Sequence, residues 1–163
     1  MHFKKYLFLH FLFRTKLNID IINDIFDRAF INFKPNTNDE LKEAVELWIL
    51  DEAKAFNIYG HMSFWNTSLI TDMSYIFQDA ENFNQPIGNW DVSNVTDMSE
   101  MFDGAKNFNQ HIGGWDVSNV TNMSWMIEGA KKFNQTICNW KPSNCQLPTL
   151  DFQAPILPTN FFF

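Results

Sequence analysis

The chain has 163 residues and a mass of 19.2 kDa, the size of a single domain. It carries 12 Lys and Arg against 19 Asp and Glu, and the resulting net charge of −7 has the wrong sign for a protein that binds phosphate backbones. Hydrophobic residues make up 45% and aromatic residues 17%, so the chain is too apolar to be disordered. No apolar run reaches the roughly 18 residues of a membrane-spanning helix. We therefore expect an acidic, aromatic-rich globular protein without a nucleic-acid partner or a membrane span.

Residues 1–34 form a basic leader, in which six Lys and Arg face three Asp. Residues 35–163 carry the balance, a net charge of −10. Lys4 and Lys5 precede a short apolar run over residues 6–13, an arrangement typical of a secretory signal. A histidine interrupts the run, however, and no small-residue cleavage site comes after it. Two interpretations stay open: a secretion signal, or an amphipathic helix that packs on the domain or on a membrane surface.

Residues 35–64 predict a helical cap on the N-terminal side of the middle of the chain. The apolar residues of this stretch lie at helical spacing: Leu41, Ala44, Val45, Trp48, Ala55 and Phe56. Asn38 or Asp39 is the expected N-cap. Such a helix would cover the open end of a repeat array, because terminal repeats need a cover.

A repeat of 25 residues dominates the middle of the chain. It is marked by four tryptophans at equal spacing, Trp65, Trp90, Trp115 and Trp140. Residues 90–114 and 115–139 share 17 identities in 25, and residues 65–89 share 14 in 25 with the second copy. Chance does not produce this self-similarity, so residues 65–144 are expected to hold three full repeats and a partial fourth.

Each repeat shows two apparent periods. Apolar residues at i, i+3, i+4 and i+7 predict a helix of about two turns; in the middle copy they are Met98, Met101, Phe102 and Ala105. The stretch from Ile112 to Val120 alternates, which predicts a short strand and a turn. The expected fold class is therefore an α/β repeat, a solenoid with one short strand and one short helix per 25-residue coil behind an N-terminal helical cap.

Stacked repeats would place equivalent side chains in ladders. The tryptophans would contribute to a continuous core, and Asn84, Asn109 and Asn134 would lie at the corner between helix and strand. Asparagine side chains at a corner can bond main-chain groups left unpaired by the turn, so we expect a structural role for them rather than a ligand role.

The pattern W-D-V-S-N-V-T-D-M-S-x-M-F-x-x-A-x-x-F-N-Q-x-I resembles the 25-residue repeat of the BspA-like leucine-rich-repeat surface proteins. This is a domain of unknown function found in bacterial surface lipoproteins, protists and some large DNA viruses. The resemblance covers residues 65–140, and the stretch from Asn38 to His61 resembles the lead-in of that family. It implies a short leucine-rich-repeat-like solenoid, usually secreted or on the cell surface, with adhesion or host-protein binding described for some members, and it does not imply an enzyme. Pro142 departs from the pattern, and residues 145–163 are expected to be an irregular cap or a degenerate tail.

The residues show no catalytic constellation and predict no cofactor and no metal. Cys138 and Cys145, with six residues between them, lack a second ligand pair for zinc, so they are either a disulfide of an exported protein or ordinary thiols. The recurring Asp72 and Asp97 lack the dense oxygen ligands of a calcium loop, which favours a solvated acidic face.

Two functions are expected from different classes. The first is a monomeric, non-catalytic module that binds a protein partner through positions that vary between repeats; these are Tyr75, Glu100 and Trp125, and also Pro86, His111 and Thr136. Trp125 is either an exposed contact anchor or a core residue facing a cap. The second is a structural repeat protein with no dedicated ligand. An intracellular interaction scaffold is a variant of the first, so the location is either the cell surface or the cytoplasm.

Overall fold

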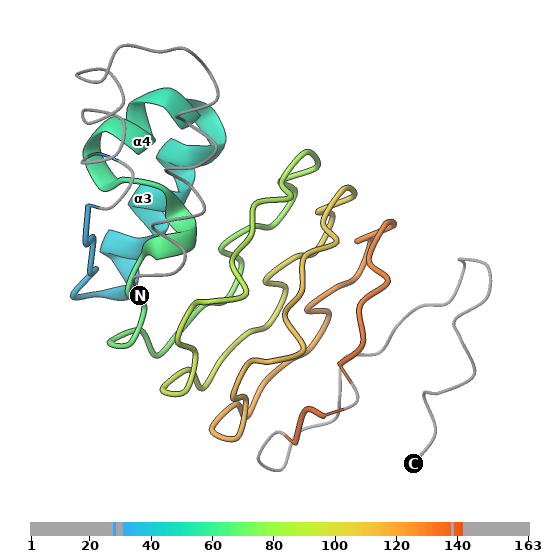
Figure 1. Cartoon of the computed structure of the whole chain (residues 1–163). Coiled ribbons are helices and arrows are strands. Elements are labelled where there is room, and N and C mark those ends of the chain that lie inside the picture. The colour runs from blue at the N-terminus through green and yellow to red at the C-terminus, as the bar shows by residue number, and fades with distance from the viewer. Residues whose placement is uncertain (1–27, 29–30, 138, 142–163) are drawn as a thin grey trace, which may run out of the picture.

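The computed structural model describes residue 28 and residues 31–137 and 139–141. Two helices, α3 (Asn38–Leu50) and α4 (Glu52–Tyr59), are followed by the short 3-10 turn η1 (Met62–Phe64). From Trp65 onward the chain forms looped repeats that lie side by side, with the two helices against the first of them (Figure 1). Most of the basic leader, Cys138, Cys145 and the tail at 145–163 lie outside the described residues.

The predicted helical stretch forms, but as two helices instead of one. Thr37 is the N-cap of α3, and its hydroxyl oxygen accepts a hydrogen bond from the Glu40 N–H at 3.1 Å. Asp51 separates the helices, because its carboxylate accepts from the Lys54 N–H at 2.9 Å and so starts α4. The expected caps, Asn38 and Asp39, are therefore the first two residues of α3.

Asn38 instead joins the helices to the repeats. Its side-chain oxygen accepts from the main-chain N–H groups of Thr71 and Asp72 in the first repeat, at 3.2 and 3.3 Å. The Trp48 ring of α3 meets the Trp65 ring edge-on, with 5.8 Å between centroids. Polar and aromatic contacts thus seat α3 on the first repeat.

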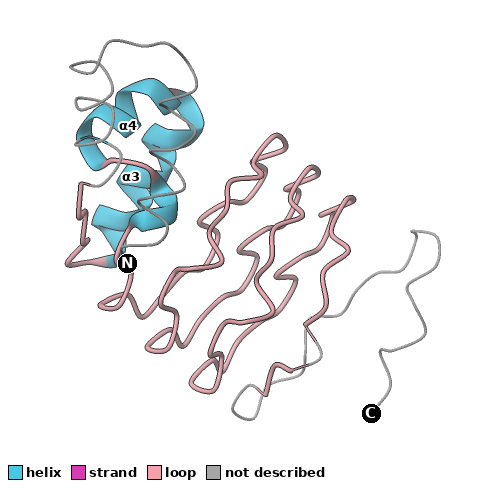
Figure 2. Cartoon of the chain, viewed as in Figure 1, coloured by secondary structure: helices cyan, strands magenta, loops and turns pink. Residues whose placement is uncertain are grey.

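The expected fold class is wrong. Within the described residues the repeats contain neither a strand nor a helix (Figure 2), so they are not a leucine-rich-repeat-like solenoid with one strand and one helix per coil. Only isolated parallel bridges join Asp72 to Asp97 and Asp97 to Asn122. The segment predicted as a helix is a series of four-residue turns, each closed by a bond from an N–H to the carbonyl three residues earlier. Examples are the bonds from the Met101 N–H to the Met98 oxygen and from the Ala105 N–H to the Phe102 oxygen. The segment predicted as a strand also turns, at 112–115 and 117–120.

Main-chain hydrogen bonds between successive repeats replace the missing sheet. Four alternate N–H groups of the first repeat donate to carbonyls of the second at 2.7 to 3.0 Å; the donors are Met73, Tyr75, Phe77 and Asp79, and the acceptors are Asp97, Ser99, Met101 and Asp103. The second repeat donates in the same way to the third, at 2.7 to 2.9 Å. Every one of these bonds runs from an N–H to a carbonyl 24 residues later. The Thr96 and Thr121 N–H groups donate back to the Thr71 and Thr96 oxygens of the preceding repeat at 2.8 Å, so bonds of both directions join the repeats.

The core consists of equivalent side chains stacked on one another. The rings of Phe77 and Phe102 are nearly parallel, with 5.3 Å between centroids, and Phe83, Phe108 and Phe133 continue a second row at 5.9 and 5.8 Å. Nearly all of the apolar residues on the inner side of the repeats are buried. Each repeat therefore completes its core only against its neighbours, which is the energetic reason that repeat proteins stack.

Two glycines allow this close stacking. A Cβ atom on Gly88 would lie 2.2 Å from the His111 carbonyl oxygen of the next repeat, and one on Gly113 would lie 2.2 Å from the Thr136 oxygen. The neighbouring Gly114 has no heavy atom within 4 Å of such a position. Space between main chains, rather than turn geometry, therefore requires glycine at 88 and 113.

We expect Gly88→Ala and Gly113→Ala each to lower the free energy of unfolding by about 3 kcal/mol, because a main-chain oxygen cannot move aside as a flexible side chain can. Gly114→Ala is the matched control and is expected to stay within about 0.5 kcal/mol of wild type. Urea unfolding followed by circular dichroism measures all three. Equal stability of the 88 and 114 variants would contradict the close approach of the repeats.

His61 lies half-buried at the junction between the helices and the first repeat. Its Nδ1 accepts a hydrogen bond from the Ser63 N–H at 3.3 Å and lies 2.8 Å from the Ser63 hydroxyl. The imidazole also packs edge-on against Trp48, with 5.5 Å between centroids. Burial lowers the pKa of His61 below its usual value, and the Glu52 carboxylate opposes this effect only in part.

We therefore expect stability to fall as the pH is lowered. The unfolded chain takes up a proton near pH 6.5, the usual histidine pKa, while the folded protein holds His61 neutral to a lower pH. The stabilisation is complete above that pH and is lost as the pH falls toward the lowered pKa. In His61→Asn the side chain can still accept from the Ser63 N–H but does not titrate, so its urea midpoint should fall less between about pH 7.5 and about pH 5.5. Equal losses in both proteins would count against this assignment.

Candidate binding surface

One row of residues in the repeats has an unusual backbone. Tyr75, Glu100 and Trp125, which occupy the same position in the three repeats, have positive φ angles of 62°, 53° and 53°. In L-amino acids this left-handed conformation costs about 1 kcal/mol or more, and glycine and asparagine tolerate it best. Four residues later in each repeat φ is positive again, and there two of the three residues are glycine, Gly104 and Gly129.

The two aromatic side chains of this row are open to solvent. Tyr75 is 50% exposed and Trp125 58% exposed, and Glu100 between them is half-buried. Main-chain bonds from the Tyr75 N–H to the Ser99 oxygen and from the Glu100 N–H to the Ser124 oxygen hold adjacent members side by side. We call these three residues the contact row. Trp125 is thus an exposed residue and not part of the core.

Glu100 is held at the centre of the contact row. The Gln78 amide donates to its carboxylate at 2.8 Å. The Glu100 carboxylate raises the pKa of the Tyr75 hydroxyl above its usual value, through its charge first and through a hydrogen bond second, and Asp97 and Asp72 add smaller effects. The row therefore presents a carboxylate between two aromatic rings.

The surroundings of the contact row are acidic. The matching segments 71–79, 96–104 and 121–129 contain six carboxylates and neither Lys nor Arg. Asp97 is bonded by the Ser99 N–H and hydroxyl and by the Asn122 amide. Partial burial alone would raise the pKa of Asp97, but these bonds outweigh it, so the pKa is lowered and the group stays ionised. Lys42 of α3 lies near enough to Asp97 to favour this charge as well.

A groove of about 420 Å³ lies beside the first repeat. Trp48, Ile49 and Glu52 of the helical region form one wall, and residues 79–85 form the other. The Trp48 indole N–H is buried and has no hydrogen-bond partner among the described residues. Asp79 is the last residue of the segment that carries Tyr75, so the groove extends the acidic surface toward the helices.

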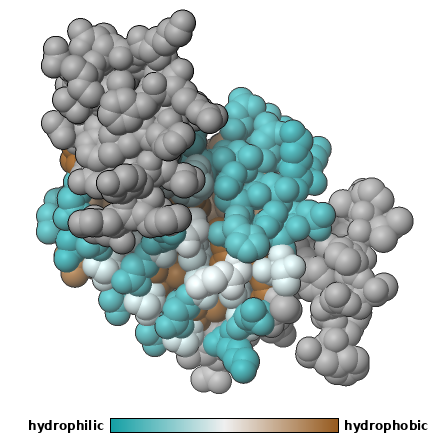
Figure 3. All heavy atoms as spheres, viewed as in Figure 1, coloured by the Kyte–Doolittle hydropathy of each residue, from teal (hydrophilic) through white to brown (hydrophobic). Residues whose placement is uncertain are grey.

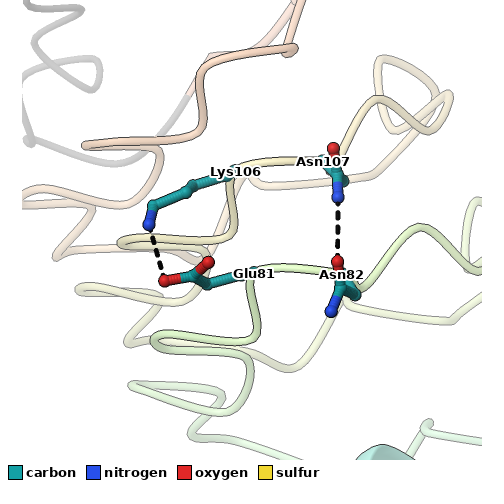
Figure 4. Close-up of polar contacts among 4 residues, drawn as sticks. All are labelled: Glu81, Asn82, Lys106 and Asn107. Atoms are coloured by element: carbon teal, nitrogen blue, oxygen red, sulfur yellow. Dashed lines mark hydrogen bonds and ion pairs between the residues drawn. The ribbon is translucent and has the colours of Figure 1, made fainter.

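The other variable positions are less distinctive. His111 is exposed, and its Nδ1 lies 2.8 Å from the Gln135 side-chain oxygen in the next repeat. Just after segments 71–79 and 96–104, Lys106 forms an ion pair with Glu81 at 2.6 Å and the Asn107 amide donates to the Asn82 oxygen at 3.2 Å (Figure 4). Hydrophilic side chains gather over one end of the repeats on the face shown in Figure 3. Contacts between neighbouring repeats thus engage the side chains of Lys106, Asn107 and His111.

The tryptophan ladder is buried. Trp65 stacks on Trp90 at 6.1 Å between centroids, and Trp115 stacks on Trp140 at 6.4 Å. The Trp90 N–H donates to the Met62 oxygen at 2.8 Å. The indole N–H groups of Trp115 and Trp140 find no such acceptor in the described part of the chain. These rings pack in the core and do not contribute to the exposed surface.

The asparagine ladder links the main chain of successive repeats. The side-chain oxygen of Asn84 accepts from the Asn109 N–H at 2.9 Å, and that of Asn109 accepts from the Asn134 N–H at 2.9 Å. The Gln110 and Gln135 amides bond the same two oxygens at 3.0 and 2.8 Å. The Asn134 side chain makes no such bond within the described residues.

Sequence reasoning missed the residues that shape the contact row from the side. Gln78 and Asp97 were not singled out as its neighbours, and neither was the groove at Trp48 and Glu52. The 25-residue register was the available signal, since it places Gln78 and Asp103 three residues after the row in successive repeats. The left-handed backbone itself has no signal in the identities of Tyr75, Glu100 or Trp125.

The described residues hold no cluster of three or more His, Cys, Asp or Glu side chains arranged to hold a metal ion. In the same residues, no helix has both the length and the apolar character to cross a membrane.

We expect Asn109→Ala to lower the free energy of unfolding by about 1 kcal/mol, because it leaves the Asn134 N–H without its acceptor and leaves the Gln135 amide only the Asn109 main-chain oxygen at 3.3 Å. Asn134→Ala removes the same side chain at the ladder position where it accepts nothing from the described residues, and should stay within about 0.5 kcal/mol of wild type. Thermal and urea unfolding of both variants test this. Equal losses would show that the corner asparagines stabilise the repeats by some other means.

Comparison with known proteins gives a family and no function. No curated protein matches the chain, and no solved structure matches it. A family model described as "Mycoplasma protein of unknown function, DUF285" matches residues 46–154. The match begins inside α3 and includes all three repeats, and it spans well over half of the 163 residues. The chain therefore belongs to the DUF285 family.

Proposed function

We propose that this protein is a non-catalytic protein-binding module whose contact row, Tyr75, Glu100 and Trp125, touches the partner. The observation that carries the proposal is the identity of these residues. Exposed aromatic side chains gain little from burial, and a left-handed backbone favours glycine or asparagine. Folding therefore does not explain Tyr75 and Trp125, whereas large aromatic side chains are the usual anchors of protein interfaces.

The geometry supports such a role. The repeats hold the three side chains in register by main-chain bonds, so the row is pre-organised and binding orders little that is not already ordered. The resemblance of the repeats to BspA-like surface proteins supports a location outside the cell or on its surface. An intracellular scaffold, or a structural repeat protein with no dedicated ligand, is the alternative.

The test replaces both aromatic residues of the row by asparagine, which accepts the left-handed backbone. We expect Tyr75→Asn/Trp125→Asn to keep the free energy of unfolding within about 1 kcal/mol of wild type, because the loss of partial packing is offset by backbone relief. Affinity capture from the native source, followed by quantitative mass spectrometry, should show a protein retained by wild type and lost by the double variant.

Leu69→Asn is the matched control. Leu69 is another exposed apolar side chain, and the next two repeats already carry asparagine at this position, Asn94 and Asn119. The control should retain the same protein as wild type. Capture of identical sets by wild type and by a folded double variant would refute the contact row as a binding surface.

A further inference from the structure

We infer that the contact row binds a lysine- or arginine-rich segment of its partner. This inference rests on the proposed function and names the chemistry of the partner. It follows from the placement of Glu100 between two exposed aromatic rings on an acidic surface. Aromatic faces attract cations through their quadrupole, and a neighbouring carboxylate adds a charge-assisted hydrogen bond.

Charge complementarity favours a lysine- or arginine-rich segment at the contact row. The segments that carry the row contain six carboxylates and no Lys or Arg, so an acidic or phosphorylated partner would be repelled. Lys42 of α3 offsets part of this charge beside Asp97 in the middle repeat. Of the lysines that follow these segments, Lys106 is already paired with Glu81, and Lys131 and Lys132 follow the third segment, which holds only one of the six carboxylates. The negative charge of the row thus remains available to a partner.

The register of the row suits an extended segment. Neighbouring hydrogen-bonded chains lie about 5 Å apart, so the row spans on the order of 10 Å. Alternate residues of an extended peptide project on one side about 7 Å apart, which places two cationic side chains within reach of Tyr75, Glu100 and Trp125. The groove beside the first repeat adds one further carboxylate, that of Glu52, in the direction of the helices.

The experiment titrates the full chain with an N-acetylated octalysine amide, and with octaglutamate for comparison, by isothermal calorimetry. We expect binding of octalysine and none of octaglutamate. Raising the salt from about 0.02 M to about 0.3 M should weaken the binding, because exposed charges are then screened. Failure of octalysine to bind at low salt would overturn the inference.

Two variants distinguish binding at the contact row from binding caused by the overall net charge of the protein. Glu100→Gln and Trp125→Leu should each weaken octalysine binding about threefold or more, the size of an exposed ion pair or cation–π contact. Asp116→Asn removes the same unit of charge outside the row, and its side-chain oxygen can still accept from the Ser118 N–H, so its affinity should match wild type. Equal weakening by Asp116→Asn and Glu100→Gln would overturn the inference, since only the total charge would then matter.

The outcome is distinguishable from that of the capture experiment. A captured protein that depends on the row, together with no octalysine binding, overturns the cationic partner and leaves the binding module standing. Octalysine binding that Trp125→Leu and Glu100→Gln weaken supports both proposals.

Discussion

The repeats depend on one constraint: main-chain N–H groups at alternate residues of one repeat must meet carbonyls of the next. Four such bonds join the first repeat to the second, and four more join the second to the third. Buried main-chain groups must be paired, so these bonds decide the backbone conformation between them. Tyr75 and Asp79, with their equivalents, take positive φ angles in the segments that make these bonds. The contact row is therefore a product of how the repeats are joined.

The same constraint explains the distribution of residue types. Inside the repeats, phenylalanine, methionine and tryptophan stack on their equivalents because each repeat lacks a core of its own. Gly88 and Gly113 lie where the main chains approach most closely. At the Asp79 position, glycine occupies the left-handed backbone in two repeats, which is the conformationally favoured solution. The contact row departs from this rule, because all three of its residues take the left-handed backbone and none of them is glycine.

The organisation of the chain could be predicted from its sequence more completely than the local structure of a repeat. The 25-residue period and the helical stretch before it follow from residue spacing alone. The prediction of a helix at Met98, Met101, Phe102 and Ala105 was wrong, because turns closed by bonds between residues three apart produce the same apolar spacing as a helix. Glu100 and Gly104 have positive φ in the middle of that segment and end any helical path. The exposed position of Trp125 depends on this backbone reversal, so apolar spacing alone could not decide between surface and core.

The regular register of the ladder also bears on how such a chain can change over evolutionary time. Each repeat makes main-chain bonds at equivalent positions with the repeat before it and with the repeat after it, so one repeat can replace another as a neighbour. Duplication or deletion of a 25-residue unit would preserve every junction. Because the side chains of Tyr75, Glu100 and Trp125 make none of these main-chain bonds, single substitutions there can change the shape and charge of the exposed surface without disturbing the scaffold.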